Sequence, residues 1–232
     1  MKRKVGFLLA TMALCLGLTV QSTMASAESG GFSSLSAKWW QWALSIPRSQ
    51  NPLLDMTGEK CMVGQRGPTW FLAGVFGGDG TPITRNCTLP DNVSLFFPVV
   101  NSVNFNSPNI CGFGPDDQSV AILRRDAAPF IDGSINLLVE VDGNRVKHLR
   151  RVQSKVFALT LPEDNLFDAF CAVPGGVYSP SVDDGVYVHL GALKAGTHVV
   201  HIHAENPSED PSVPGFFLDV TYMLTVKHVS LK

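Results

Sequence analysis

The sequence predicts a mainly β protein, an antiparallel β-sandwich or jelly roll with one or two short helices. About eight segments show the two-residue alternation of half-buried strands or short apolar runs, most of them between Gly, Pro and Asn turns. Strands and helices do not alternate regularly, which disfavours a parallel α/β fold. With 232 residues, 45% of them hydrophobic, the chain is long enough to bury a sizeable core.

The first 27 residues have the pattern of a secretory signal peptide. Three basic residues, Lys2 to Lys4, precede an apolar run from Val5 to Val20, and Ala25-Ser26-Ala27 is a small-residue cleavage signature. The alternative is an uncleaved N-terminal anchor. Cleavage would leave one domain, residues 28–232, without a transmembrane segment. We therefore expect an exported protein, periplasmic or extracellular.

The charge balance disfavours nucleic-acid binding. Without Lys2, Arg3 and Lys4, 15 basic residues stand against 20 acidic ones, and no long basic block remains. Phosphate backbones are bound mainly through clustered Lys and Arg. We expect no nucleic-acid partner.

The cysteine count predicts two disulfides. Cys15 belongs to the signal peptide, which leaves an even number of cysteines in an exported chain. Three connectivities are possible, and proximity along the chain favours Cys61–Cys87 with Cys111–Cys171. A four-cysteine metal site is the competing interpretation, but the chain has no Cys-x-x-Cys spacing.

Helical spacing of apolar residues predicts a short amphipathic helix from Leu35 to Ile46 that Pro47 ends. It contains Trp39, Trp40 and Trp42. The helix would either plug one end of the sandwich or present an aromatic platform for sugar stacking or for a membrane interface. Trp40 alone lies off the apolar stripe, so we expect its ring to be exposed and available to a ligand.

The middle of the chain predicts a buried strand, a helix and a hairpin. Val93 to Asn101 reads as a buried strand in which Pro98 marks an edge or a bulge. Asp116 to Ile131 has helical spacing, although Pro129 would end the helix early. Ile135 to Val141 alternates up to the turn signal Asp142-Gly143.

A small basic patch follows this turn, formed by Lys147, His148, Arg150 and Arg151. It would either contact an anionic polymer or protect an edge strand from aggregation by its charge. Another strand is expected from Ser154 to Leu161, and a long loop from Pro162 to Asp184.

The C-terminal part predicts three consecutive strands. Apolar residues alternate in Val186 to Ala192 and again in His198 to Ala204. A three-residue loop, Lys194 to Gly196, would pair these strands with all apolar side chains on one face.

This register places His189 opposite His201, and Tyr187 opposite His203. The following strand, Phe216 to Val226, would add Asp219 to the same face if it continues the meander.

These residues are candidate metal ligands. Three imidazoles directed at one point, with Asp219 or water in a fourth position, are typical of zinc and copper sites. A metal-bound hydroxide there would hydrolyse or hydrate a substrate. The alternative is an ordinary solvated strand face. Tyr187, beside the histidines, is with Trp40 a candidate ligand-binding residue.

Several motifs resemble a group of uncharacterised exported bacterial proteins: WWQWALSIP, NPLLD, GEKCMVGQ, WFLAG, LKAGTHVVHIHA and FFLDVTYMLTV. The resemblance covers most of the chain after the signal peptide. It implies export and a single domain, and it implies no activity, cofactor or catalytic residue.

Two functions follow from these observations. The first is a secreted, non-catalytic β-sandwich that needs no cofactor and binds a glycan or an envelope protein through loops and exposed aromatic side chains. The second is a metal-binding protein or metal-dependent hydrolase or hydratase that uses the three histidines. The chain has neither a Gly-x-Ser-x-Gly elbow nor a His-Glu-x-x-His motif, so the sequence leaves open whether it is an enzyme.

Overall fold

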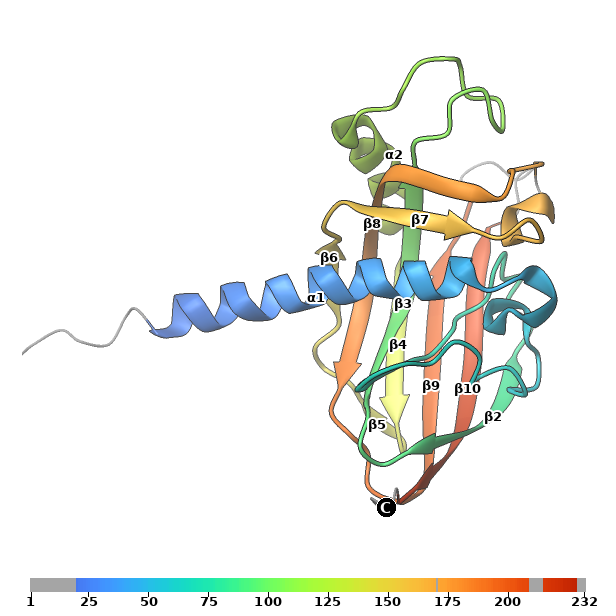
Figure 1. The fold of residues 1–232 in the computed structure, drawn as a ribbon. Helices are drawn as coiled ribbons and strands as arrows, with labels where there is room; N and C mark the ends of the chain where they lie inside the picture. Colours follow the sequence, from blue (N-terminus) through green and yellow to red (C-terminus); the bar gives the residue numbers. More distant parts are fainter. Residues whose placement is uncertain (1–19, 170, 209–214, 229–232) are drawn as a thin grey trace, which may run out of the picture.

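The computed structural model describes residues 20–169, 171–208 and 215–228, with only the backbone described for residues 20–30 and Ala169. Two five-stranded sheets form a β-sandwich, which confirms the mainly β prediction (Figure 1). The elements are α1 (Val20–Ser45), short 3-10 helices at Arg48–Gln50, Pro52–Leu54 and Leu166–Ala169, β1 (Thr69–Phe71), β2 (Ile83–Pro90), β3 (Ser94–Phe105), α2 (Val120–Asp132), β4 (Ile135–Val141), β5 (Asn144–Arg145), β6 (Arg150–Gln153), β7 (Phe157–Leu161), β8 (Gly176–Leu190), β9 (Gly196–Asn206) and β10 (Phe216–Lys227).

Both sheets are mixed. Sheet A has the order β1-β3-β8-β6, with β7 also paired to β8, and sheet B has the order β2-β10-β9-β4-β5. Most neighbours are antiparallel, but β1 runs parallel to β3 and β2 runs parallel to β10. The predicted antiparallel sandwich thus includes one parallel strand pair in each sheet. Because β1, β2 and β3 alternate between the sheets, hairpin turns do not join them.

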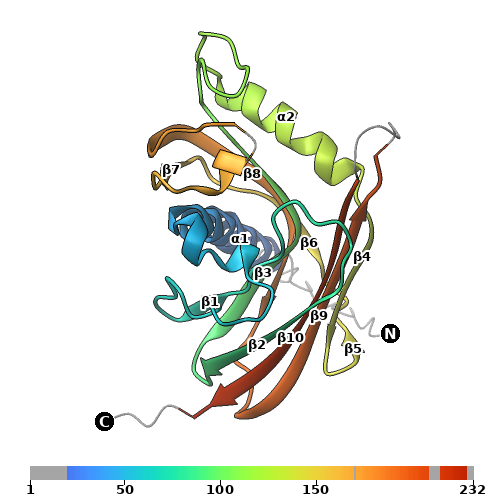
Figure 2. The same cartoon turned by 90° about the vertical axis from the view of Figure 1, so that its right-hand side faces the viewer.

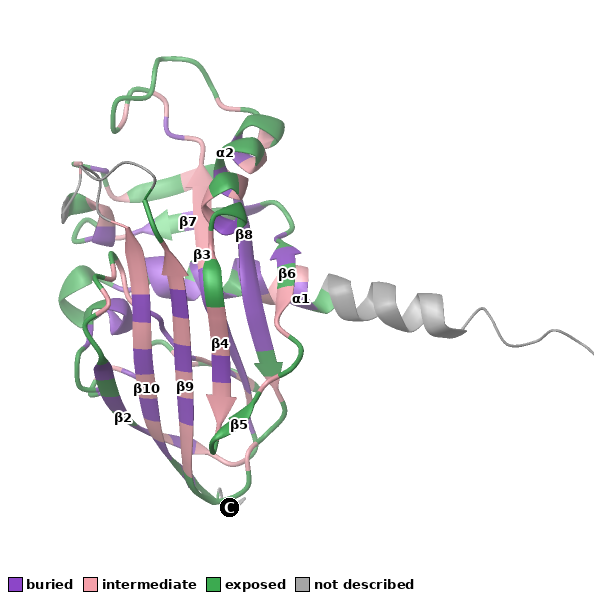
Figure 3. Ribbon diagram, turned by 180° about the vertical axis from the view of Figure 1, so that it is seen from behind, coloured by how far each residue is buried: buried purple, intermediate pink, exposed green. Residues whose placement is uncertain are grey.

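The main core fills the space between the sheets. Leu95, Phe97 and Val188 point into it from sheet A, and Ile202 and Val220 from sheet B, each at most 1% exposed. Along β9 and β10 buried residues alternate with half-buried ones, as Figure 3 shows. Burial of each such side chain contributes roughly 1.5–3 kcal/mol, so this core supplies much of the stability.

A second core lies between α1 and the other face of sheet A. In Figure 2, α1 lies between β7 and β1, on the side of sheet A that faces away from sheet B. The rings of Trp39, Trp40 and Trp42 are buried there with Phe96 and Tyr187. The helix therefore covers a sheet face and does not plug an end of the sandwich.

The limits of α1 only partly match the prediction. The helix ends at Ser45, before Pro47 as expected, but it begins at Val20 and not near Leu35. Residues 1–19 of the predicted signal peptide lie outside the described residues, and the expected cleavage after Ala27 falls within α1. Cleavage thus stays a prediction. In the part of the chain that the structure describes, no helix has the length and apolar character of a membrane span.

Helix α2 confirms the second predicted helix. The Ser119 side chain accepts a hydrogen bond from the backbone N–H of Ile122, which caps the first turn. Leu123, Ala127 and Ile131 are buried, as the spacing predicted. Pro129 does not end the helix early, because α2 continues to Asp132.

Both predicted disulfides are present. Cys61–Cys87 joins the segment before β1 to β2, and Cys111–Cys171 joins two loops that are 60 residues apart in the sequence. Such bonds are typical of proteins in oxidising compartments.

Two local features of the strands also agree with the sequence. The pairing of β3 with β8 shifts register between Pro98 and Val100, which is the predicted bulge. β4 and β5 form the predicted hairpin, and both turn residues, Asp142 and Gly143, have positive φ angles, of 51° and 74°.

The prediction that the strands around Val186 to Ala192 and His198 to Ala204 form a hairpin was wrong. β8 belongs to sheet A, where β3, β6 and β7 are its partners, whereas β9 lies in sheet B between β4 and β10. Residues 191–195 therefore connect the two sheets. β8 also begins at Gly176, so Asp183 and Asp184 lie in a strand and not in the expected loop.

Candidate functional site

The structure brings together only part of the predicted metal site. His201 and His203 lie on the solvent face of sheet B, and Asp219 of the adjacent β10 lies between them. One carboxylate oxygen of Asp219 is 3.1 Å from Nε2 of His201, and the other is 3.5 Å from Nδ1 of His203. The meander of β9 and β10 that the sequence predicted is confirmed.

His189 does not join this group. It lies on sheet A, where Phe96 of β3 is its strand partner, and its ring packs edge-on against the rings of Phe32 and Phe96. The expected cluster of three histidines was wrong, because alternation along β8 and β9 specified the face of each strand but not the sheet to which it belongs.

The remaining imidazole nitrogens of the pair also face carboxylates. Nε2 of His203 is 3.0 Å from Glu205, and this hydrogen bond lowers the pKa of the Glu205 carboxyl. Nδ1 of His201 is 3.8 Å from Glu140. Across the described ranges, no group of three or more His, Cys, Asp or Glu side chains is arranged to hold a metal ion. The geometry is thus a row of partly exposed contacts between histidine rings and carboxylates.

The two predicted ligand-binding residues are buried. Trp40 is 5% exposed and Tyr187 is fully buried, between α1 and sheet A. Trp40 lies off the apolar stripe, yet it is covered because sheet A surrounds α1 on more than one side (Figure 2). The prediction that the Trp40 ring is exposed was wrong.

Both residues instead hold a buried carboxyl group. The indole N–H of Trp40 and the hydroxyl of Tyr187 donate to the same oxygen of Asp183, at 2.7 and 2.8 Å. The other oxygen has no hydrogen-bond partner among the described residues. Burial raises the pKa of Asp183 to about 7.

A cavity of about 760 Å³ lies at the edge of the sandwich, where the chain passes from β5 of sheet B to β6 of sheet A, and we call it the basic pocket. α1 and the end of β8 also contribute residues to its lining. Its lining residues are Gly31, Phe32, Leu35, Val146, Lys147, His148, Leu149, Arg150, Val188 and His189.

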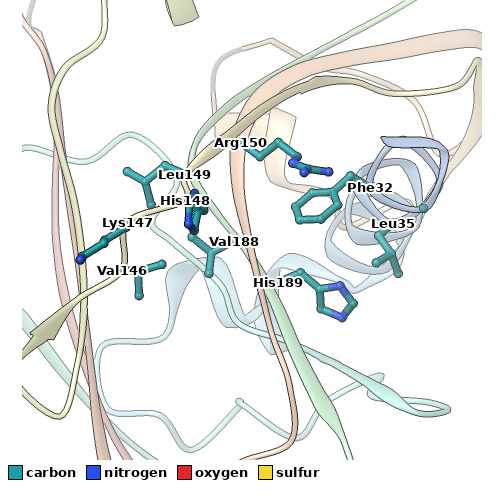
Figure 4. Close-up of a pocket in the computed structure, with 10 residues that line it drawn as sticks. Phe32, Leu35, Val146, Lys147, His148, Leu149, Arg150, Val188 and His189 are labelled. Atoms are coloured by element: carbon teal, nitrogen blue, oxygen red, sulfur yellow. The ribbon is translucent and has the colours of Figure 1, made fainter. Parts of the chain in front are cut away.

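The pocket combines positive charge with apolar walls. Lys147 and His148 are exposed, and the guanidinium carbon of Arg150 lies 4.8 Å from the centre of the Phe32 ring. Figure 4 shows the Arg150 side chain beside this ring. Burial lowers the pKa of His189. None of the described lining residues is acidic. The pocket therefore favours a ligand that carries negative charge beside an apolar group.

The sequence signalled the basic side chains but not the pocket. Lys147, His148, Arg150 and Arg151 were recognised as a patch that would contact an anion or protect an edge strand. Arg151 points elsewhere, because it pairs with Asp184 at 3.0 Å and with Asp132. Phe32 and His189 line the same pocket as Lys147, His148 and Arg150. They are brought there by the pairing of β6 with β8 and by the packing of α1, which no local pattern reveals.

No family model, no curated protein and no solved structure matches the chain.

Proposed function

We propose that this chain is an exported, ligand-binding β-sandwich that holds an amphipathic anion in the basic pocket. The observation that carries the proposal is the lining of that cavity, which includes Lys147, His148 and Arg150 beside apolar residues and, among the described residues, no acidic one. An acidic envelope component fits this lining. A neutral glycan would leave the three side chains unused.

The physical basis is charge-assisted hydrogen bonding beside a surface that removes an apolar group from water. Guanidinium groups bind carboxylates, sulfonates and phosphates through two parallel N–H donors. The apolar part of the ligand would contact Leu35 and Leu149, which are half-buried in the free protein. Each 25–30 Å² of apolar surface removed from water adds roughly 0.7 kcal/mol.

Export is the second part of the proposal. The two disulfides support an oxidising compartment. The signal-peptide pattern of residues 1–27 and the resemblance to exported bacterial proteins point to the periplasm or the extracellular space.

A pair of fluorescent probes tests the binding proposal. Anilinonaphthalene sulfonate carries an aromatic body and a sulfonate, and phenylnaphthylamine has the same body without the charge. We expect saturable binding of the sulfonate to the protein at neutral pH. Replacement of both Lys147 and Arg150 by glutamine should weaken that binding about tenfold, which corresponds to about 1.4 kcal/mol.

A matched variant separates local contacts from overall charge. Lys38→Gln with Arg145→Gln removes the same two charges from exposed positions on α1 and β5 that do not line the pocket. It should bind the sulfonate as tightly as the unaltered protein. Equal weakening in both double variants, or unchanged binding in both, would contradict the proposal.

A further inference from the structure

A second cavity of about 250 Å³ has a different lining. It lies where α1, α2 and the start of β10 approach one another, and we call it the aromatic pocket. Three aromatic pairs line it, with ring centres 5.0–5.8 Å apart: Trp39 with Trp40, Phe76 with Phe167, and Phe130 with Phe216. Aromatic faces carry partial negative charge, so several rings around one space favour a cation.

Two polar residues, Asn101 and Ser102, line this pocket. Nδ2 of Asn101 donates to the Tyr187 hydroxyl at 3.1 Å, and that hydroxyl in turn donates to Asp183. One of the two amide N–H groups of Asn101 is thereby used, and its side-chain oxygen can accept a hydrogen bond from a ligand hydroxyl.

An adjoining cavity of about 250 Å³ adds negative charge. It shares Leu53, Val75, Phe76 and Gly77 with the aromatic pocket, and its lining includes Asp79 and also Asp219, whose carboxylate already faces His201 and His203. A hydrogen bond from the backbone N–H of Thr81 lowers the pKa of Asp79, which keeps this carboxylate ionised at neutral pH. None of the described residues that line either cavity is Lys, Arg or His.

We propose that the aromatic pocket binds a small organic cation with apolar substituents, of the quaternary ammonium class. The trimethylammonium group would lie among the six rings, and the remainder of the ligand would extend toward the carboxylates of the adjoining cavity. This site is separate from the basic pocket, with which it shares no lining residue. The basic pocket carries positive charge, whereas the described lining of the aromatic pocket is uncharged and adjoins two carboxylates, so one ligand does not serve both.

Choline and its neutral isostere 3,3-dimethylbutanol test this inference, because the two differ in charge but hardly in shape. Titration of the full chain is followed by calorimetry and by tryptophan fluorescence, since Trp39 and Trp40 line the site. We expect choline to bind about tenfold more tightly than the alcohol, the ratio that cation–π contacts in a desolvated site typically give. Equal affinities, or saturable binding of neither compound, would overturn the proposal.

Phenylalanine-to-leucine variants locate the site. Phe167→Leu and Phe216→Leu keep apolar volume but remove a π face, so each should weaken choline binding about threefold and leave binding of the alcohol nearly unchanged. Phe113→Leu is the matched control, because Phe113 is 49% exposed and does not line the aromatic pocket. If choline and the alcohol weaken together in the first two variants, loss of packing explains the result and the proposal fails. Sulfonate binding at the basic pocket should not change in any of them.

Discussion

In the unaltered protein, the free energy of unfolding is expected to fall by about 4 kcal/mol between about pH 4 and pH 7, because of Asp183. Replacement of Asp183 by asparagine is expected to abolish this fall. Burial raises the pKa of this carboxyl group from 3.8 to about 7 in the folded chain. As the pH rises through this window, the unfolded chain releases the proton first, so the folded state binds more protons. Stability therefore decreases with rising pH and levels off above about pH 7.

Asparagine keeps an oxygen that can accept from Trp40 and Tyr187 and cannot ionise. Urea unfolding of the unaltered protein and the variant, at half-unit steps from pH 4 to pH 8, gives the difference directly. Asp116→Asn serves as the control, because Asp116 is exposed. An Asp183→Asn curve that falls with pH as steeply as that of the unaltered protein would show that this group is ionised throughout.

Replacement of Arg85 by methionine is expected to lower the free energy of unfolding by about 4 kcal/mol. The side chain is 1% exposed and donates to the backbone carbonyls of Asp55, Ala73 and Gly74 at 2.6–2.9 Å. It also donates to the Tyr222 hydroxyl at 2.8 Å. Methionine fills similar space but takes the donor away from the buried carbonyls of Asp55 and Gly74, whereas the Ala73 carbonyl still accepts from the Tyr222 hydroxyl.

Thermal and urea unfolding of Arg85→Met measure this effect. Arg145→Met is the matched control, since Arg145 lies exposed on β5 and should change the free energy of unfolding by less than about 0.5 kcal/mol. A loss below about 1 kcal/mol in Arg85→Met would mean that the carbonyls find other donors and that Arg85 does not organise the loops before β2.

Local patterns predicted what depends on local chemistry. The turn at Asp142-Gly143 and the bulge at Pro98 follow from backbone preferences, and alternation along β9 and β10 correctly separated inner from outer residues. The disulfide pairing was a choice among three, made on proximity along the chain.

Sheet membership could not be read in the same way. Alternation in β8 is equally consistent with either sheet. The sequence also suggests that the face of β8 opposite the main core is exposed to solvent, because no local pattern shows that α1 covers it. Tyr187 is buried only because three tryptophans of α1 cover that face, more than 140 residues away in the sequence. The same long-range packing brings Phe32 to Arg150 and so creates the basic pocket. Side chains that meet through tertiary packing leave no periodic signal.

The central claim, that an amphipathic anion occupies the basic pocket, is tested most directly by amide chemical-shift mapping during titration with anilinonaphthalene sulfonate. We expect the largest shifts on residues 31–35, 146–150 and 188–189, with small changes at Phe76, Phe167 and Phe216. Shifts concentrated on the aromatic pocket, with residues 146–150 unchanged, would contradict it, because the probe would then follow apolar surface and not positive charge.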